Sequence, residues 1–163
     1  MVMESQNIQD FLKEPETFYG LENKYDRIVS VLGGSSQVGY IQSDIDLIKI
    51  TRKGLPVSVV VSISNILGIS MEKMSNLLHI SHRTIQRKHD DELLSVYSTE
   101  QILEIAEVIS RGIEVLGTLG TFTKWVHREI RALDNKKPID YLDTGFGIQM
   151  VKDLLGRIEH GVY

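Results

Sequence analysis

Apolar side chains recur at intervals of three and four residues along most of this chain, the spacing that places them on one face of an α-helix. The clearest stripe is Ile102, Ala106, Ile109, Ile113 and Leu116. The pattern predicts helices near residues 44–53, 57–67, 71–78, 82–89, 99–116, 121–131 and 145–160. We therefore expect an almost wholly α-helical protein, folded as a small helical bundle.

Small polar residues and glycines mark the predicted helix ends. Hydroxyl side chains that can accept hydrogen bonds from first-turn backbone N–H groups precede four of the helices, at Ser43, Ser70, Ser81 and Thr144. Glycines, which tolerate the left-handed backbone that often closes a helix, follow several of them, at Gly54, Gly68, Gly117 and Gly161. These signals depend only on neighbouring residues, so they should survive in the folded protein.

Other positions carry more specific expectations. The β-branched run at 57–63 also permits a strand, and it is the most ambiguous part of the pattern. Ser98 and Gln101 have the spacing of a capping box and predict the start of the long helix. Phe122 and Trp125 are expected in the core. Gly156 lies inside an apolar stripe, where it predicts a close approach between helices.

The first 27 residues are polar, contain Pro15, and predict a mobile arm that can include a short helix. They hold neither a signal-peptide pattern nor a long apolar run, so we expect a cytoplasmic protein without a membrane span. The chain has no cysteine, which removes disulfides and thiolate zinc sites. Its net charge of −4 means that any contact with DNA must come from a local basic patch.

Such a patch occurs in the stretch HISHRTIQRKHDDE at 79–92. Three short predicted helices with a tight second connection describe a helix-turn-helix, whose third helix, here opened by Ser81, lies in the DNA major groove. Hydroxyl groups on that helix can bind phosphates, whereas arginine and glutamine can each make paired hydrogen bonds with a base. The candidate DNA-binding residues are Ser81, His82, Arg83, Thr84, Gln86, Arg87 and Lys88.

The same stretch permits other interpretations. A helical bundle can carry a basic surface turn without binding DNA, and the pattern alone leaves both possibilities open. A metal site at His79 and His82 would need further ligands. His127 with Glu129 or Asp143 could be proposed as catalytic, but the chain lacks a nucleophile–base pair and a glycine-rich cofactor turn, so we expect no enzyme activity, no cofactor and no metal.

Several further motifs follow one another in a fixed order: VLGG at 31–34, GLP at 54–56, ILGIS at 66–70, HISHRTIQRK at 79–88, PIDYLDT at 138–144 and the final LLGRIEHGVY. In this order they resemble the Xre/MbcA/ParS-type antitoxins. Single pieces are weak, but their order is specific, and the resemblance runs from about residue 28 to residue 163. It implies an Xre-like helix-turn-helix region at 28–95 and a toxin-binding and dimerisation domain at 96–163, after the arm at 1–27.

The resemblance also implies a function. Antitoxins of this family neutralise a partner toxin, often a RES-domain enzyme that consumes NAD, and repress their own operon as dimers. The expected partners are therefore a cognate toxin, operator DNA and a second copy of the chain, with no membrane. The expected toxin-binding residues are Arg157, Ile158, Glu159, His160, Gly161, Val162 and Tyr163. The alternative is a stand-alone Xre-type transcription regulator that has no toxin partner.

Overall fold

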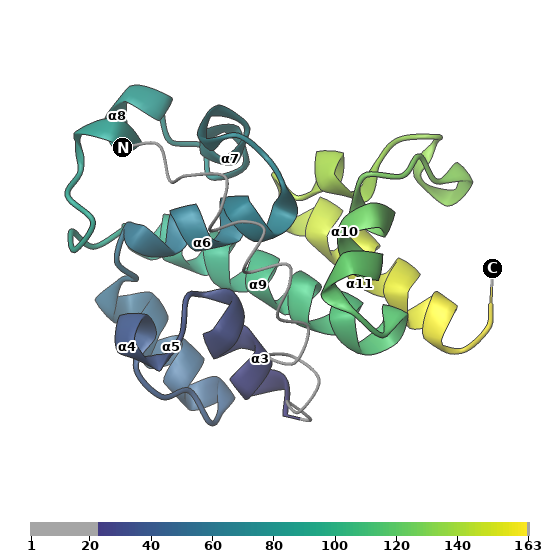
Figure 1. The fold of residues 1–163 in the computed structure, drawn as a ribbon, viewed down its shortest axis with the longest axis horizontal. Helices are drawn as coiled ribbons and strands as arrows, with labels where there is room; N and C mark the ends of the chain where they lie inside the picture. Colours follow the sequence, from purple (N-terminus) through teal and green to yellow (C-terminus); the bar gives the residue numbers. More distant parts are fainter. Residues whose placement is uncertain (1–22, 163) are drawn as a thin grey trace.

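The structure is a computed structural model, and residues 23–162 are described (Figure 1). The helices are α3 (Lys24–Val31), α4 (Ser35–Val38), α5 (Asp44–Lys53), α6 (Ser58–Leu67), α7 (Met71–Leu77), α8 (His82–Arg87), α9 (Val96–Leu116), α10 (Leu119–Val126) and α11 (Gly145–Glu159), with short 3₁₀ turns η1 (Arg131–Leu133) and η2 (Pro138–Tyr141). Over this range there is no strand, which confirms the all-α prediction. None of the described helices is long and apolar enough to cross a membrane.

The long helix α9 runs through the middle of the molecule and contacts α3, α5, α6, α10 and α11 (Figure 1). Its predicted stripe lies in the core: Ile102, Ala106 and Ile109 are fully buried. Ile105, which lies between them, is fully buried as well. Because helices pack on several sides of α9, its apolar face is wider than the stripe predicted.

The ambiguous run at 57–63 forms helix α6 rather than a strand. Val59, Val60, Ile63, Ile66 and Leu67 are buried there, so the β-branched residues fill a core that surrounds much of the helix. Tertiary packing therefore overrides their strand propensity.

Two helices begin earlier than predicted, α9 by three residues and α10 by two. Helix α9 begins after Ser95, whose hydroxyl accepts a hydrogen bond from the Ser98 backbone N–H, so the capping box predicted at Ser98 and Gln101 is wrong. Helix α10 likewise begins after Thr118 and ends at Val126, whereas the pattern predicted 121–131. In both cases an earlier hydroxyl residue provides the N-cap.

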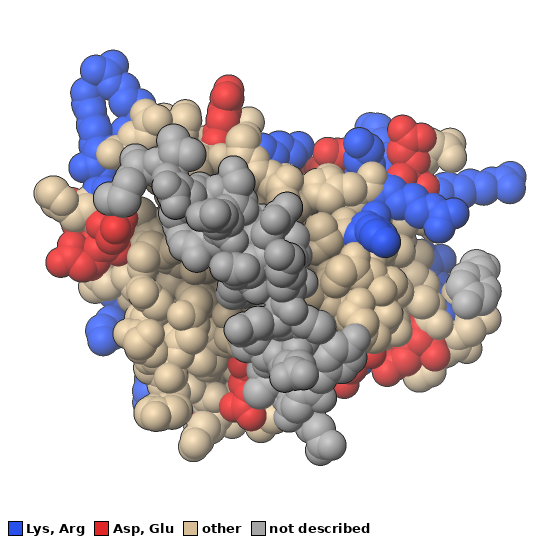
Figure 2. All heavy atoms as spheres, in the orientation of Figure 1, with Lys and Arg blue, Asp and Glu red and all other residues tan. Residues whose placement is uncertain are grey.

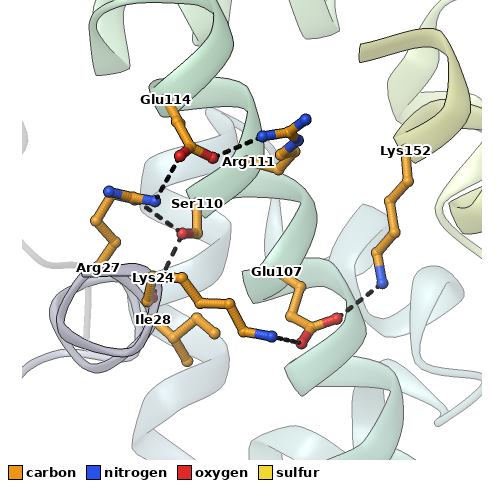
Figure 3. Close-up of a pocket in the computed structure, with 8 residues that line it drawn as sticks. All are labelled: Lys24, Arg27, Ile28, Glu107, Ser110, Arg111, Glu114 and Lys152. Atoms are coloured by element: carbon orange, nitrogen blue, oxygen red, sulfur yellow. Dashed lines mark hydrogen bonds and ion pairs between the residues drawn. The ribbon is translucent and has the colours of Figure 1, made fainter. Parts of the chain in front are cut away.

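Residues 24–27, which the sequence analysis assigned to the arm, form the first turn of α3, whereas residues 1–22 lie outside the described range. Arg27 is only 5% exposed. Its Nε donates to the Ser110 hydroxyl on α9 at 3.0 Å, and its guanidinium lies 3.6 Å from Glu114. Figure 3 shows these residues around a pocket of about 210 Å³. The helix was missed because this partner lies 83 residues away in the sequence.

Figure 3 also shows ion pairs that connect α3 and α11 to α9. Lys24 on α3 lies 3.6 Å from Glu107 on α9, and Lys152 on α11 reaches the other oxygen of the same carboxylate at 2.8 Å. Burial alone would lower the pKa of Lys152, but hydrogen bonds to Glu104 and Glu107 outweigh that effect and raise it. The acids of α9 thus hold α3 and α11 on either side of it.

Phe122 is fully buried, as expected, and its ring lies 6.3 Å from that of the partly buried Trp125. The close approach predicted at Gly156 is absent, because a Cβ there would meet no atom within 4 Å. Tight glycines lie elsewhere: a Cβ at Gly112 of α9 would collide with the Phe122 ring, and a Cβ at Gly147 of α11 would collide with the Tyr141 carbonyl. The sequence shows where a glycine interrupts an apolar helix face, but it does not show which glycine lies against another helix.

Candidate functional site

Helices α7 and α8 form a compact pair with a tight turn between them. The Ser70 hydroxyl accepts from the Lys73 backbone N–H at 3.1 Å, and the Ser81 hydroxyl accepts from the Thr84 backbone N–H at 3.0 Å, so both predicted caps are confirmed. Only Ile85 of α8 is buried. Because α8 is so short and buries one side chain, most of its other side chains face the surface.

Five of the seven predicted DNA-binding residues are exposed, whereas His82 and Lys88 are partly buried. Arg83, Gln86 and Arg87 are exposed, while the Ser81 and Thr84 hydroxyls lie 2.6 Å apart and bond to each other. In Figure 2 basic side chains project over α8 at the upper left of the molecule. Within the described residues, the basic cluster of the sequence thus forms a basic surface on α8.

Lys88 differs from the two arginines. It ends α8 in an extended conformation, and its Nζ lies 3.5 Å from the Glu92 carboxylate. Glu92 also accepts the His89 backbone N–H, and this hydrogen bond is the main cause that lowers its pKa. The Val57 backbone N–H donates to the Glu92 carbonyl at 2.8 Å, so the acidic loop is fastened to the start of α6.

The α7–α8 turn is also fastened to the second half of the chain. His79 has a left-handed backbone, and its Nε2–H donates to the Asp143 carbonyl at 2.6 Å. The buried Gln101 side chain donates to the Leu77 carbonyl at 3.3 Å and to the Leu142 carbonyl at 2.8 Å. One amide therefore joins the end of α7 to the turn before α11, a role that spacing within the sequence does not reveal.

Helix α11 ends with a defined turn. After Glu159, Gly161 adopts a left-handed backbone, the Val162 N–H donates to the Arg157 carbonyl at 2.8 Å, and the Gly161 N–H donates to the Ile158 carbonyl at 3.1 Å. This pair of hydrogen bonds is a Schellman motif, which closes the helix and turns the chain away from its axis. Val162 is 56% exposed. Tyr163 lies outside the described residues.

The two charged side chains predicted to bind the toxin, Arg157 and Glu159, differ in whether they form an ion pair within the fold. Glu159 forms an ion pair with Arg111 on α9, and hydrogen bonds to Glu114 and Glu159 raise the pKa of Arg111 despite its partial burial. Arg157 is exposed. The carboxylate of Glu159 is therefore used within the fold, whereas the guanidinium of Arg157 faces the surface.

The histidine considered for catalysis has a structural partner. The Nε2–H of His127 donates to the Leu67 carbonyl at 2.6 Å, which ties the end of α10 to the end of α6. Among residues 23–162 no cluster of three or more histidine, aspartate or glutamate side chains could hold a metal ion.

Comparison with known proteins agrees with this arrangement. The family described as "Antitoxin Xre-like helix-turn-helix domain" matches residues 46–107, and the family described as "Antitoxin Xre/MbcA/ParS C-terminal toxin-binding domain" matches residues 111–161. Together these two matches cover more than half of the chain. The first contains α6, α7 and α8, and the second contains α10 and α11.

Curated relatives are similar over most of their length. "Antitoxin Xre" of Yersinia enterocolitica is 27% identical over 72% of this chain and 80% of its own, and "Antitoxin Xre" of Photorhabdus laumondii is 28% identical over 69% and 78%. "Prs ADP-ribosylating antitoxin" of a Sphingobium species is 25% identical over 76% and 84%.

Among solved structures, a chain of the M. tuberculosis MbcT–MbcA toxin–antitoxin complex aligns with a TM-score of 0.46 and 21% identity, over 66% of this chain and 96% of that one. The two consecutive domain matches and the curated relatives identify the chain, which belongs to the Xre/MbcA/ParS family of antitoxins.

Proposed function

We propose that this antitoxin neutralises a RES-type, NAD-consuming toxin by binding it and represses its own operon through α8, without catalysing a reaction itself. The observation that carries the proposal is the order of two domains on one chain: a helix-turn-helix with an exposed basic helix, then a toxin-binding domain. The name of the Sphingobium relative, "Prs ADP-ribosylating antitoxin", supports this chemistry, because ADP-ribosylation uses NAD as the donor.

Neutralisation is proposed to involve residues 157–163. The Schellman turn after α11 directs Val162 away from the helix axis, where an apolar side chain can enter a pocket of the toxin. Tyrosine, as at position 163, is a frequent anchor in interfaces because it buries a large ring and keeps a polar tip. Removing residues 161–163 should restore much of the toxin activity while DNA binding stays intact. Full neutralisation at equal stoichiometry would show that this segment is dispensable.

DNA binding is proposed to depend on Arg83 and Arg87. Each alanine substitution should weaken operator binding by about 1–3 kcal/mol where the arginine makes a bidentate contact with a base. Lys88→Ala should act more evenly across sequences and reduce the salt dependence, because a phosphate contact carries no sequence information. Lys49→Ala on α5, which removes one charge elsewhere, is the matched control. Unchanged affinity in the Arg83/Arg87 double variant would remove α8 from the DNA interface.

The antitoxin is further proposed to act as a homodimer formed mainly by residues 96–163. Such a dimer should prefer two operator half-sites about one helical turn apart. Light scattering on the protein alone, without toxin or DNA, should give the mass of a dimer. A monomer mass at high concentration would contradict this part of the proposal.

Co-expression tests the proposal as a whole. The chain should be produced with the protein encoded beside it in the genome, with an affinity tag on one of the two. An antitoxin should co-purify with its neighbour and suppress the neighbour's NAD consumption. A stand-alone transcription regulator would bind the operator but would leave the neighbouring protein in the unbound fraction.

A further inference from the structure

A groove of about 790 Å³ lies on the toxin-binding domain, between the end of α9, α10, η1 and α11. Its lining includes apolar side chains from three helices: Leu116 of α9, Trp125 of α10 and Leu154 and Ile158 of α11. Leu116, Trp125 and Ile158 are only partly buried, so they keep apolar surface that the fold does not cover. This is the kind of floor on which an interface residue of another protein can be buried.

Three arginines and one acid border the same groove: Arg128, Arg131 and Arg157, with Glu129, so positive charge exceeds negative charge there. All three are exposed, and within residues 23–162 none of them has an ion-pair partner. The cations of the pocket in Figure 3 are different, since the acids of α9 neutralise Arg111 and Lys152. The groove therefore presents positive charge that the fold leaves available.

The charge is concentrated locally. Residues 124–137 carry five basic and two acidic side chains, in a chain whose net charge is −4. Figure 2 shows basic side chains gathered on the right, over the region that follows α10, far along the molecule from those of α8 at the upper left. An acidic protein thus has two separate basic surfaces, and the expected DNA interface accounts for only one of them.

We infer that this groove receives an acidic segment of the toxin, one that presents an apolar side chain flanked by carboxylates. The inference rests on the proposed function, because it names the partner chemistry of the same toxin-binding domain. Arginine binds a carboxylate through two parallel hydrogen bonds, and arginine and tryptophan are enriched among residues that dominate binding energy. The apolar floor takes the side chain, and the arginines pair with the carboxylates beside it.

Two observations favour a toxin over DNA as the occupant. A phosphate backbone gains nothing from the apolar surface of Leu116 and Ile158, whereas a protein segment buries it. The groove is also continuous with the segment proposed to block the toxin, because Arg157 and Ile158 belong to both. A single partner can therefore contact the groove and the turn after α11 at the same time.

Charge reversal in the full-length chain tests the inference. The variant Arg128→Glu/Arg131→Glu changes two exposed side chains, so circular dichroism and thermal unfolding should match the wild type. Its matched control, Lys49→Glu/Lys53→Glu on α5, makes the same change in net charge away from the groove. The probe is the purified protein encoded beside this chain, titrated by calorimetry at low and at high salt.

The groove variant should raise the Kd for that protein by about tenfold or more and reduce its salt dependence, while the control stays within about twofold. Ile158→Ala, which removes apolar surface without changing charge, should also weaken binding but leave the salt dependence unchanged. A wild-type complex that tolerates the double reversal without loss would overturn the inference and leave the proposed function standing.

Three other outcomes of the same experiment would also decide whether the groove binds the toxin. If the wild-type chain does not bind its neighbour at all, the proposed function fails, and the occupant inferred for the groove is lost with it. If the double reversal weakens binding to duplex DNA but not to the neighbouring protein, the groove is a nucleic-acid contact. If it changes only the mass of the protein alone in light scattering, the groove receives a second copy of this chain. Either result overturns the inference.

Discussion

Gln101→Met should destabilise this protein markedly, although the residues next to Gln101 in the sequence give no sign of its role. Gln101 is 7% exposed, and its amide donates to the carbonyls of Leu77 and Leu142. Leu77 closes α7, so its carbonyl is one of those that a helix end leaves without an intrahelical partner. Methionine has nearly the same length and shape but provides no N–H group.

The magnitude follows from the two hydrogen bonds. Each neutral hydrogen bond contributes about 0.5–1.5 kcal/mol, and the contact with Leu142 at 2.8 Å should count more than the one with Leu77 at 3.3 Å. The free energy of unfolding should therefore fall by about 2 kcal/mol. For a chain of this size that corresponds to a decrease in Tm of about 4–8 °C. Gln101→Glu should cost more at neutral pH, because a carboxylate would face two carbonyl oxygens without a proton to donate.

Urea unfolding followed by circular dichroism measures the effect, with the slope of the transition compared between variants. Gln149→Met is the matched control, because Gln149 lies on the exposed surface of α11 and donates to the nearby Asp153 at 2.8 Å. The control should change the free energy of unfolding by less than about 0.5 kcal/mol. An equally small change in Gln101→Met would refute the argument that this amide joins α7 to the turn before α11.

Two further predictions concern packing and charge. Gly112→Ala should lower the free energy of unfolding by about 1–3 kcal/mol, because the new Cβ would collide with the fully buried Phe122 ring. Gly156→Ala should raise the free energy of unfolding by up to about 1 kcal/mol, because no atom lies near its Cβ and alanine favours the helix. Thermal unfolding of the two variants checks both predictions. The raised pKa of Lys152 means that its ion pairs with Glu104 and Glu107 contribute fully below the ordinary lysine pKa of 10.5 and are lost as pH rises through the higher folded value. Urea unfolding should therefore show a decrease in stability in this alkaline range that Lys152→Met lacks, and identical pH profiles would contradict the prediction.

Local signals in the sequence predicted the helices from α5 onward and most of their ends, whereas α3 and α4 were missed. The predicted caps Ser43, Ser70, Ser81 and Thr144 all accept a backbone N–H in the folded protein. Such a cap depends on residues two or three positions away, so it can be recognised from the sequence. The basic surface of α8 was also predictable, because one buried position, Ile85, fixes which side chains of a six-residue helix face outward.

Tertiary structure decided what depends on partners far along the chain. Arg27 is held in α3 by Ser110, and Gln101 finds its acceptor 41 residues away, so neither role appears in the spacing of nearby residues. The groove is likewise formed where α9, α10 and α11 meet, and among the described residues its three arginines form no ion pair, unlike Arg111 and Lys152. Periodicity reports which face of a helix is apolar, whereas packing decides how much of that face is covered and which charges are neutralised.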